Sequence, residues 1–534
     1  MTKNLFEKIQ AIYQQYDNAA LLTLLDSVAK KLRTKHDTDP TLTLVQRAQE
    51  LAAIRLPDDY WRIFKHMYWL DGEVPADFQL AADQYRTELE KQQGVPGISE
   101  QNIWLWDNNT AQPMVVLNQQ SKKRYRSKWC QLQQLWRVFW VLPKIWLCYR
   151  KVLRQSFQHP TTLTNRVGIA LDAVQMQHQL PLLAQLQNIP VLLRFVCHET
   201  ETQWQATITL IEKLVNQKNK IAVALLQDRD AVLQPKKWRA FLQFIIPNIY
   251  DKVEWIEIGH AINRVKWGIW QTAEYCQLVK IAFEFEMQYP KLRFVGPAVI
   301  DFEWYRVIDA LRALPKKIHF YGLSQHLYVD RRGAPENHQG KFSTLEKCAL
   351  GKAMAQTLDG NGRYIISEMN WPLKETGIWS PIGSPYTAPE WFRDRPGVTE
   401  SEYANYLIRY LSICLCSGHV EQIFIWRLAA HGYGLVDDRD DWRLRPAFFA
   451  LKQFVSILGS ATFIKKLSSA KTTYLLLFQR EQLKIILAWT VKDSCTVNLP
   501  FTNYRRESCI GETELVSAEV VLTEQPSYFF EKLG

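Results

Sequence analysis

A single carboxylate, Glu368, stands between a short apolar run at residues 364–366 and a loop rich in Trp, Pro and Gly that includes Trp371 and Trp379. The apolar run is predicted to form a buried strand. Barrel enzymes carry their reactive groups where such strands end. A carboxylate at that place can serve as a nucleophile, a general acid or a general base. A strand-end Glu that is merely exposed to solvent would have the same local sequence. The rest of the chain must therefore show whether Glu368 is a catalytic or a solvent-exposed residue.

Short apolar segments alternate with helix-like segments between residues 166 and 426. The predicted strands cover residues 167–171, 189–195, 221–226, 253–258, 292–295, 318–321, 364–366 and 423–426. Eight β/α units in about 250 residues are typical of a (β/α)8 TIM barrel. A doubly wound sheet has the same rhythm, but the Gly-rich phosphate turn that usually follows an early strand is missing. We therefore expect an α/β fold with a closed barrel.

Three further regions accompany the barrel, which is expected to span residues 161–457. Apolar residues at helical spacing predict an N-terminal helical region over residues 1–120. A basic, Trp-rich amphipathic segment follows at residues 121–160. Strand patterns follow one another toward the C-terminus and predict a small β-sandwich over residues 458–534.

The segment 122–154 combines basic flanks with a Trp-rich amphipathic helix that contains Trp129, Trp136, Trp140 and Trp146. Such a pattern is typical of a helix that lies in an anionic membrane surface. A buried helix that docks the N-terminal region on the barrel fits the same pattern. Nucleic-acid binding is disfavoured, since Gly-rich loops and exposed stacking platforms do not accompany the charge.

Composition narrows the class of protein. An apolar fraction of 47% and a charged fraction of 22% in 534 residues are ordinary for globular domains. Nine cysteines without a Cys-x-x-Cys pair argue against a disulfide framework and a zinc site. Neither a secretory signal nor a membrane span is expected. The expected location is the cytoplasm, with peripheral attachment to the inner face of the membrane as an open alternative.

The predicted strand ends collect polar and aromatic side chains. They include Arg194, His198, Glu199, Asp228, Glu257, His260, Asn263, Asp301, His326, Tyr328, Asn370 and Trp426. With these residues and Glu368, the chain resembles the clan A glycoside hydrolases over residues 166–455. The text around His326 and Glu368 is also similar to poorly characterised glycosidase-like proteins that are associated with bacterial surface-polysaccharide gene sets.

The resemblance implies a role for each matching residue. Glu368 falls where the clan keeps its nucleophile on strand seven, and Trp426 matches the strand-eight aromatic that floors the sugar subsite. His326 and Tyr328 resemble the His-x-Tyr element after strand six, and Arg194 resembles the strand-two arginine. These three would hold the nucleophile and the region of the sugar 2-hydroxyl. Further candidate substrate-binding residues are Asn263, Trp371 and Trp379.

One position departs from the pattern. The clan ends strand four in Gly-Asn-Glu-Pro-Asn, whose Glu is the general acid/base, and the matching residues here place Ala261 at that position. Hydrolysis needs a second carboxyl group, about 5–5.5 Å away for retention or about 6.5–9.5 Å away for inversion. Another carboxylate (Glu257, Asp301 or Asp228) or the imidazole of His260 are the alternative proton donors.

Two functions remain open at this point. The first is a glycoside hydrolase or transglycosidase that acts on a bacterial glycan or glycolipid, with Glu368 as the nucleophile. The second is a non-hydrolytic glycan-binding or scaffold protein of surface-polysaccharide biosynthesis, because an alanine cannot transfer a proton. A carbohydrate partner is expected in both, without a cofactor or a metal, and the oligomeric state is left open.

Overall fold

The computed structural model describes the greater part of the chain. The described residues are 5, 7–9, 11, 12, 18–56, 58–69, 76–93, 102–107, 111–117, 119–125, 127–329, 333–359, 361–374, 376, 397–439 and 441–531. The chain divides into two compact units, one of residues 1–126 with 372–397 and one of residues 127–371 with 398–534.

The first unit is mainly helical. Its helices are α2 (Asn18–Thr38), α3 (Leu44–Ala52), α4 (Asp58–Trp69), α5 (Ala76–Gln93) and α6 (Gln119–Tyr125). Leu21, Leu25 and Ala29 share one face of α2 and are buried in a common apolar core. A capping box of Thr43 and Gln46 begins α3. The predicted N-terminal helical region is confirmed, and it is joined by an antiparallel hairpin, β1 (Ile103–Asp107) and β2 (Gln112–Val116), that the sequence analysis did not predict.

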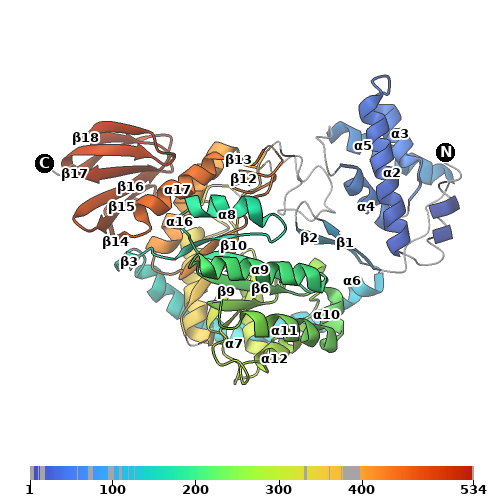
Figure 1. Cartoon of the computed structure of the whole chain (residues 1–534), viewed down its shortest axis with the longest axis horizontal. Helices are drawn as coiled ribbons and strands as arrows, with labels where there is room; N and C mark the ends of the chain where they lie inside the picture. The colour runs from blue at the N-terminus through green and yellow to red at the C-terminus, as the bar shows by residue number, and fades with distance from the viewer. Residues whose placement is uncertain are drawn as a thin grey trace. The chain divides into compact units, whose positions relative to one another are not determined.

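The second unit contains a closed barrel of eight parallel strands, which confirms the predicted (β/α)8 fold (Figure 1). Its strands are β4 (Val167–Ala170), β5 (Val191–Val196), β6 (Ile221–Leu226), β7 (Trp255–Ile258), β8 (Phe294–Ile300), β9 (Gly322–His326), β10 (Tyr364–Met369) and β11 (Gln422–Ile425). Each strand pairs with the next along the chain, and β11 closes the barrel against β4. All eight carboxyl ends therefore lie at one end of the barrel.

Strand six lies four residues beyond its predicted start. The sequence analysis placed it at residues 318–321, but β9 spans Gly322–His326 and carries Ser324, Gln325 and His326, all at most 1% exposed. Apolar runs mark strands that are buried on both faces, and this strand instead buries polar side chains. Gln325, for example, donates to the Asp301 carbonyl oxygen at 2.7 Å and accepts from the Tyr364 hydroxyl at 2.9 Å. The shift makes His326 the last residue of a barrel strand.

Helices follow the barrel strands. They are α8 (Met176–Gln185), α9 (Glu201–Asn216), α10 (Arg229–Leu233), α11 (Pro235–Ile249), α12 (Thr272–Phe283), α13 (Trp304–Ala313), α14 (Thr344–Met354), α16 (Glu400–Cys416) and α17 (Pro446–Leu458). Capping boxes at Thr200, Ser343 and Thr399 begin α9, α14 and α16. Cys414 and Cys416 are buried on α16, as predicted for core residues.

The basic, Trp-rich segment forms one long helix, α7 (Lys128–Arg154), that packs on α13 and α14 of the barrel. Its buried side chains, Gln134, Val138, Ile145, Tyr149 and Val152, follow one narrow stripe. Arg137 contributes an ion pair to Asp309 on α13 at 2.7 Å. Among the described residues, no helix has both the length and the apolar character to cross a membrane.

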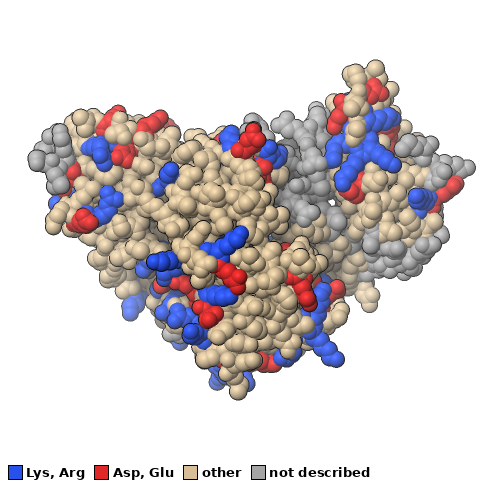
Figure 2. Space-filling view, in the orientation of Figure 1, with Lys and Arg blue, Asp and Glu red and all other residues tan. Residues whose placement is uncertain are grey.

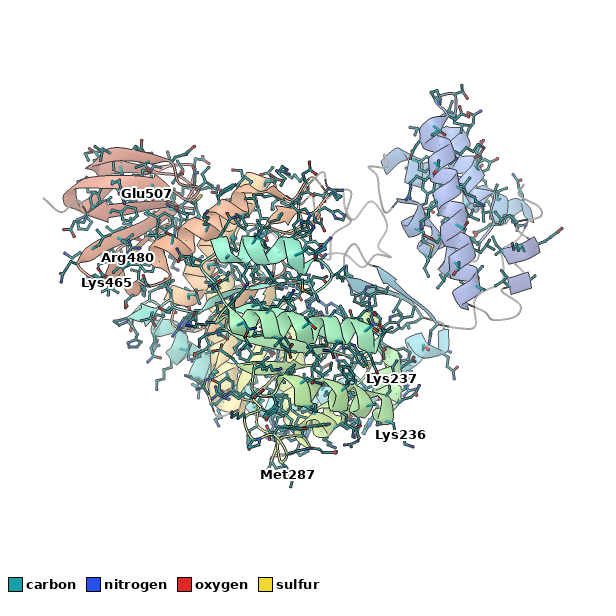
Figure 3. All side chains as sticks on the ribbon, viewed as in Figure 1. Lys236, Lys237, Met287, Lys465, Arg480 and Glu507 are labelled. Carbon is teal, nitrogen blue, oxygen red and sulfur yellow. The ribbon has the colours of Figure 1, made fainter. Side chains whose placement is uncertain are left out.

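An antiparallel sheet follows the barrel, where a small β-sandwich was predicted over residues 458–534. Seven strands pair in the order β18, β17, β19, β16, β15, β14, β3. Their bounds are β3 (Thr161–Thr162), β14 (Thr462–Lys466), β15 (Thr473–Arg480), β16 (Leu483–Thr490), β17 (Cys495–Ser508), β18 (Thr513–Leu522) and β19 (Ser527–Glu531). Arg480 donates to the Ser456 carbonyl oxygen at 3.0 Å and Glu507 accepts from Gln453 at 2.5 Å, so the C-terminal half of helix α17 contacts the sheet (Figure 3).

Charged side chains of both signs are interspersed over the barrel and the C-terminal sheet on the face that Figure 2 shows. Many of them form ion pairs across neighbouring helices. Lys237 at the start of α11, labelled in Figure 3, lies 3.0 Å from Asp228, and Arg239 lies 2.5 Å from Glu284 on α12. Such exposed pairs contribute little to stability.

Candidate functional site

Glu368 lies near the end of β10 and is 6% exposed. The Arg194 guanidinium, from β5, binds one of its carboxylate oxygens, and the Tyr328 hydroxyl, from the segment after β9, donates to the other. Hydrogen bonds and a cation at both oxygens favour the ionised form of a carboxylate. Glu368 is therefore in contact with two of the three residues that the resemblance assigned as its holders, Arg194 and Tyr328.

Arg194 is held from its other side by an indole. Its guanidinium carbon lies 3.1 Å from the ring centroid of Trp426, directly after β11. Trp426 is 7% exposed, and the Arg194 side chain is 10% exposed. Stacking on an aromatic face suits the planar, weakly hydrated guanidinium. Trp426 thus fixes the cation that binds Glu368, in addition to any contact with a ligand.

Two imidazoles lie beside the same carboxylate. His260 Nε2 is 3.9 Å and His326 Nδ1 is 4.0 Å from Glu368 Oε2, and the two ring centroids are 4.5 Å apart. Burial lowers the pKa of His260 well below its usual 6.5, and the Arg194 charge lowers it further. His260 is therefore neutral near pH 7, which disfavours it as the imidazolium acid that the sequence analysis considered.

Glu257 lies on the opposite side of the His326 ring from Glu368. Its Oε2 is 3.4 Å from His326 Nε2, and its Oε1 accepts a hydrogen bond from Ser367 at 2.5 Å. The described ion pairs join Glu257 to His326 and Arg194 to Glu368. Glu257 is 1% exposed, and the His326 ring contacts it through Nε2 while its Nδ1 lies 4.0 Å from Glu368.

The contact of Ser367 with Glu257 was not predicted, because a serine in a strand carries no distinctive signal. Neighbouring residues of a regular strand point to opposite faces. The pairing of β10 with β11 is irregular between Ile366 and Met369. This bulge lets Ser367 and Glu368 both take part in the site.

The loop after β7 contains Ala261, at the position that the resemblance to clan A assigns to the general acid/base. Ala261 is fully buried, with φ of +40°, and Gly259 has φ of +83°. The Gln227 side chain accepts from His260 N at 2.9 Å and donates to the carbonyl oxygens of His260 and Trp267 at 3.0 and 2.8 Å. Gln227 thereby fixes the loop that presents His260. Its role was not predicted, since one Gln after a strand is not distinctive.

Asn263 and Asp301 take part in a different network from Glu368. The Asn263 amide donates to the Ile300 carbonyl oxygen and accepts from the Ile300 nitrogen, both at 3.0 Å. Asp301 forms an ion pair with Arg264 at 2.7 Å. These contacts join the loop after β7 to the end of β8. The described contacts of Asn263 do not fit the substrate-binding role predicted for it, and those of Asp301 do not fit a proton donor.

The three tryptophans predicted to line the sugar subsites differ in where the structure places them. Trp371 is fully buried, its indole N–H donates to the Gly333 carbonyl oxygen at 2.9 Å, and its ring packs against Tyr403 and Tyr410 of α16. It therefore belongs to the core between β10 and α16, and the prediction that it forms a sugar-facing wall is wrong. Trp379 lies outside the described residues. Trp426 stays the aromatic beside Glu368.

A metal could be held by one group of side chains in the described part of the chain. Ligand atoms of Glu257, His260 and His326 all lie within 4.8 Å of one another. His198, Glu199 and Asp228, which also follow barrel strands, do not form such a group. Asp228 instead caps α10 and accepts from Ala231 N at 2.6 Å.

Glu199, in the loop after β5, is a second perturbed carboxyl group. Burial raises its pKa from 4.5 to about 7; a hydrogen bond from Val196 N opposes this shift, and the Asp172 carboxylate adds to it. A raised folded-state pKa means that the folded protein prefers the neutral form. The contribution of Glu199 to the free energy of unfolding is therefore most favourable below pH 4.5 and is lost as the pH rises through about 7.

We expect Glu199→Gln to remove this pH dependence. The variant should match the wild type near pH 4.5 and be more stable at pH 8, by on the order of 1–3 kcal/mol. The amide oxygen of Gln can still accept the hydrogen bond from Val196. Thermal unfolding midpoints at the two pH values measure the effect, with exposed Glu201→Gln as the control. A Glu199→Gln difference that is the same at both pH values would contradict the assigned shift.

No protein-family model matches the sequence, and a search of curated proteins finds no match. Solved glycoside hydrolase structures are similar at low identity. A GH30 endoxylanase from Clostridium papyrosolvens C71 has a TM-score of 0.46 and 10% identity, over 71% of this chain and 98% of that one. The virulence factor SghA from Agrobacterium tumefaciens has a TM-score of 0.39 and 8% identity, over 58% and 99% of the two chains.

Thermotoga maritima Cel5A, solved with cellobiose, has a TM-score of 0.35 and 10% identity, over 55% of this chain and 96% of that one. At these TM-scores the fold assignment rests on the closed parallel barrel itself. What the site does must be argued from its own geometry.

Proposed function

We propose that this protein is a glycoside hydrolase or transglycosidase that acts on a bacterial glycan or glycolipid. The observation that carries the proposal is the carboxylate of Glu368, held at the carboxyl end of barrel strand β10 by Arg194 and Tyr328 beside the indole of Trp426. In a (β/α)8 barrel this end is where reactions take place. The arrangement fits the resemblance to clan A enzymes.

The chemistry assigned to Glu368 is nucleophilic. One carboxylate oxygen attacks the anomeric carbon, the bond from that carbon to the leaving oxygen breaks, and the glycosyl ester on Glu368 is later cleaved by water or by an acceptor hydroxyl. Arg194 and Tyr328 fix the direction of the carboxylate, which lowers the cost of reaching the reactive geometry. The tyrosine can pass its hydrogen bond to the ring region of the sugar as the ester forms.

The site is less well equipped to protonate the leaving oxygen than to position the nucleophile. Ala261 cannot donate a proton, and Glu257 lies behind His326. Leaving groups that depart without a proton should therefore react best. A panel of 2,4-dinitrophenyl glycosides, compared with methyl glycosides of the same sugars, tests the proposal. Release of dinitrophenolate above the Glu368→Gln background supports it, and no release from any sugar contradicts it.

The buried Ala261 also favours the alternative of a non-hydrolytic glycan-binding or scaffold protein of surface-polysaccharide biosynthesis. The two functions separate in one experiment. On a glycan array, a binding protein retains its ligand without turnover, whereas an enzyme consumes it or releases a product. If the protein only binds a glycan, Glu368→Gln should weaken that binding, and neither the wild type nor the variant should release a product.

We further propose that α7 attaches the protein to an anionic membrane surface, such as the inner face of the cytoplasmic membrane. The helix carries no acidic residue and exposes large apolar side chains on the faces that do not pack on the barrel. Trp129, Leu135, Trp136, Phe139, Trp140 and Leu147 are each more than 60% exposed. Soluble surfaces rarely expose so large a contiguous apolar patch. Basic residues such as Lys144 and Lys151 are also exposed and complement anionic headgroups.

Replacing Trp136, Phe139 and Trp140 together with Ser should weaken binding to vesicles that contain phosphatidylglycerol by at least about 10-fold, because each interfacial aromatic contributes buried apolar area. The fold should be unaffected, since these side chains are exposed. Co-sedimentation with vesicles measures the effect. Met287→Ser, at a residue that is 94% exposed elsewhere on the barrel, is the control. Equal vesicle binding by the triple variant and the control would contradict the proposal and would mean that α7 has only a structural role.

A further inference from the structure

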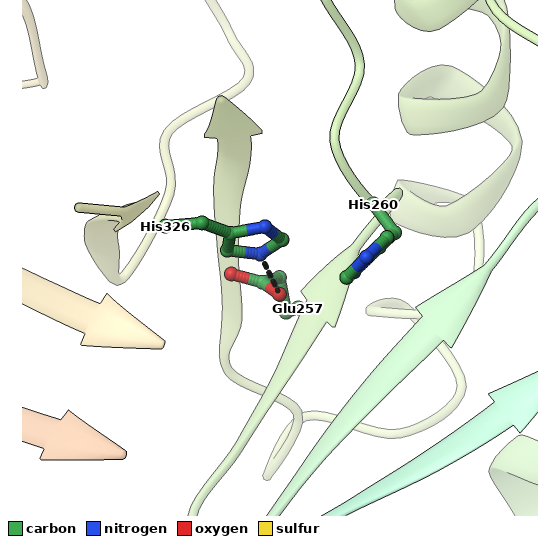
Figure 4. Close-up of side chains that lie close together, drawn as sticks. All are labelled: Glu257, His260 and His326. Carbon is green, nitrogen blue, oxygen red and sulfur yellow. Dashed lines mark hydrogen bonds and ion pairs between the residues drawn. The ribbon is translucent and has the colours of Figure 1, made fainter. Parts of the chain in front are cut away.

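A cluster of metal-binding side chain types lies beneath Glu368. Glu257 comes from β7, His260 from the loop after it, and His326 from the end of β9, so their backbone positions are set by the two strands on either side of β8 (Figure 4). They are 1%, 2% and 1% exposed. One ligand atom from each lies within 4.8 Å of the other two. Two imidazoles and one carboxylate form a donor set that suits divalent transition metals.

Protein contacts alone leave this cluster incompletely paired. Among the described residues, the buried Nδ1 atoms of His260 and His326 have no hydrogen-bond partner. A buried polar atom without a partner destabilises the folded protein. Both rings are more than nine-tenths buried, so bulk water does not reach them freely. His260 Nδ1 can therefore bind a further atom within the cluster, whereas the unpaired Nδ1 of His326 lies on the side of Glu368, 4.0 Å from Oε2.

The spacing of the cluster also fits a metal. His326 Nε2 and Glu257 Oε2 are 3.4 Å apart, which is long for a hydrogen bond. Metal–nitrogen and metal–oxygen bonds of about 2.0–2.2 Å at tetrahedral angles place two ligand atoms about 3.4 Å apart. The Ser367 hydroxyl binds the other oxygen, Glu257 Oε1, and so directs Oε2 to the cluster. Such support is what ligating carboxylates usually have.

We propose that Glu257, His260 and His326 bind one divalent metal ion of the zinc class. The remaining ring nitrogens then face the carboxylate of Glu368, since His260 Nε2 and His326 Nδ1 are 3.9 and 4.0 Å from Glu368 Oε2. At these distances Glu368 is a negative charge beside both rings and is not their hydrogen-bond acceptor. Three protein ligands leave a further coordination position for water. The metal was not expected from the sequence, and its binding does not depend on the proposed glycosidase activity.

The test uses the untagged, full-length protein after treatment with a chelator. Titration with Co2+ should show one equivalent bound per chain, with the visible absorption of a tetrahedral nitrogen and oxygen site, and Zn2+ should displace it. Glu257→Gln and His326→Ala should each weaken Co2+ binding by at least about 10-fold. Glu257→Gln keeps the shape of the side chain and an acceptor for Ser367, so it should fold even where His326→Ala does not. His178→Ala, at an exposed histidine on α8, is the matched control.

Two outcomes would overturn the proposal. One is the failure of the wild-type protein to bind Co2+ or Zn2+ stoichiometrically, which needs no variant. The other is stoichiometric binding that is unchanged in Glu257→Gln, because the ion would then lie elsewhere. Loss of glycosidase activity plays no part in either readout, so the metal site can fail while the proposed function stands, and the reverse also holds.

Discussion

Arg194→Met is expected to destabilise the barrel unit by roughly 3–5 kcal/mol at neutral pH, because it leaves the Glu368 carboxylate buried without its cation. The side chains of the pair are 10% and 7% exposed, so solvent cannot replace the guanidinium. The stacking of Arg194 on Trp426 is lost as well. Urea unfolding followed by tryptophan fluorescence measures the change.

Two further variants make this result specific. Arg239→Met removes an exposed ion pair with Glu284, whose side chains are 40% and 54% exposed, and should change stability by less than about 1 kcal/mol. The double variant Arg194→Met/Glu368→Gln removes both charges and should recover a large part of the loss. An Arg194→Met cost no larger than that of Arg239→Met would mean that Glu368 and Arg194 are not a buried pair.

Glu368→Gln is expected to lower the rate of dinitrophenyl glycoside cleavage by at least about 10³-fold, because an amide is a poor nucleophile. The substitution also leaves Arg194 without its partner, so a loss of fold must be separated from a loss of chemistry. Glu368→Asp keeps the charge but withdraws the carboxylate by one methylene. A displacement of about 1 Å costs on the order of 10²-fold in rate.

The expected order of rates is therefore wild type, Glu368→Asp, then Glu368→Gln. The exposed residue Glu212, whose side chain is 53% exposed, supplies the control variant Glu212→Gln. Turnover by folded Glu368→Gln at the wild-type rate would remove Glu368 from the reaction. If every variant lost folded protein in proportion to its loss of rate, Glu368 would be needed for stability and not for the reaction.

The barrel itself was predictable because its strands are buried on both faces. Such strands form short apolar runs, as at β6 and β10, and helices with clear capping residues separate them. β9 shows where this signal fails. Its residues 324–326 are Ser, Gln and His, all buried, and Gln325 is hydrogen-bonded inside the barrel. The apolar run before this strand therefore gives a false prediction of its position.

The centre of the site was predictable to the extent that a strand end limits where a side chain can lie. Glu368, Arg194, Tyr328 and Trp426 follow or end different strands, and the parallel barrel brings all such ends together. The sequence does not contain the direction of a side chain after a bulge or a turn. That is why the role of Ser367, the separation of Glu257 from Glu368 by His326, and the burial of Trp371 required the structure.

The sequence pattern of the α7 helix is compatible with two interpretations, a helix docked on the barrel and a helix at a membrane surface. Its polar and apolar residues fit both a docked helix and an interfacial one, and the structure shows features of each. A narrow stripe around Val138 and Ile145 packs on the barrel, while Trp136 and Trp140 are 64% and 61% exposed. Hydrophobic periodicity reports that a helix has an apolar face but does not report how wide the covered part is.

Covalent trapping tests the central claim most directly. A 2-deoxy-2-fluoro glycoside with a dinitrophenyl leaving group, built on whichever sugar is cleaved, should form a glycosyl ester that turns over slowly. Peptide mass spectrometry should then locate one sugar per chain on the peptide that contains Glu368, and Glu368→Gln should carry none. A label on Glu257, Glu199 or another carboxylate, or turnover of the parent glycoside with no ester on Glu368, would contradict the account.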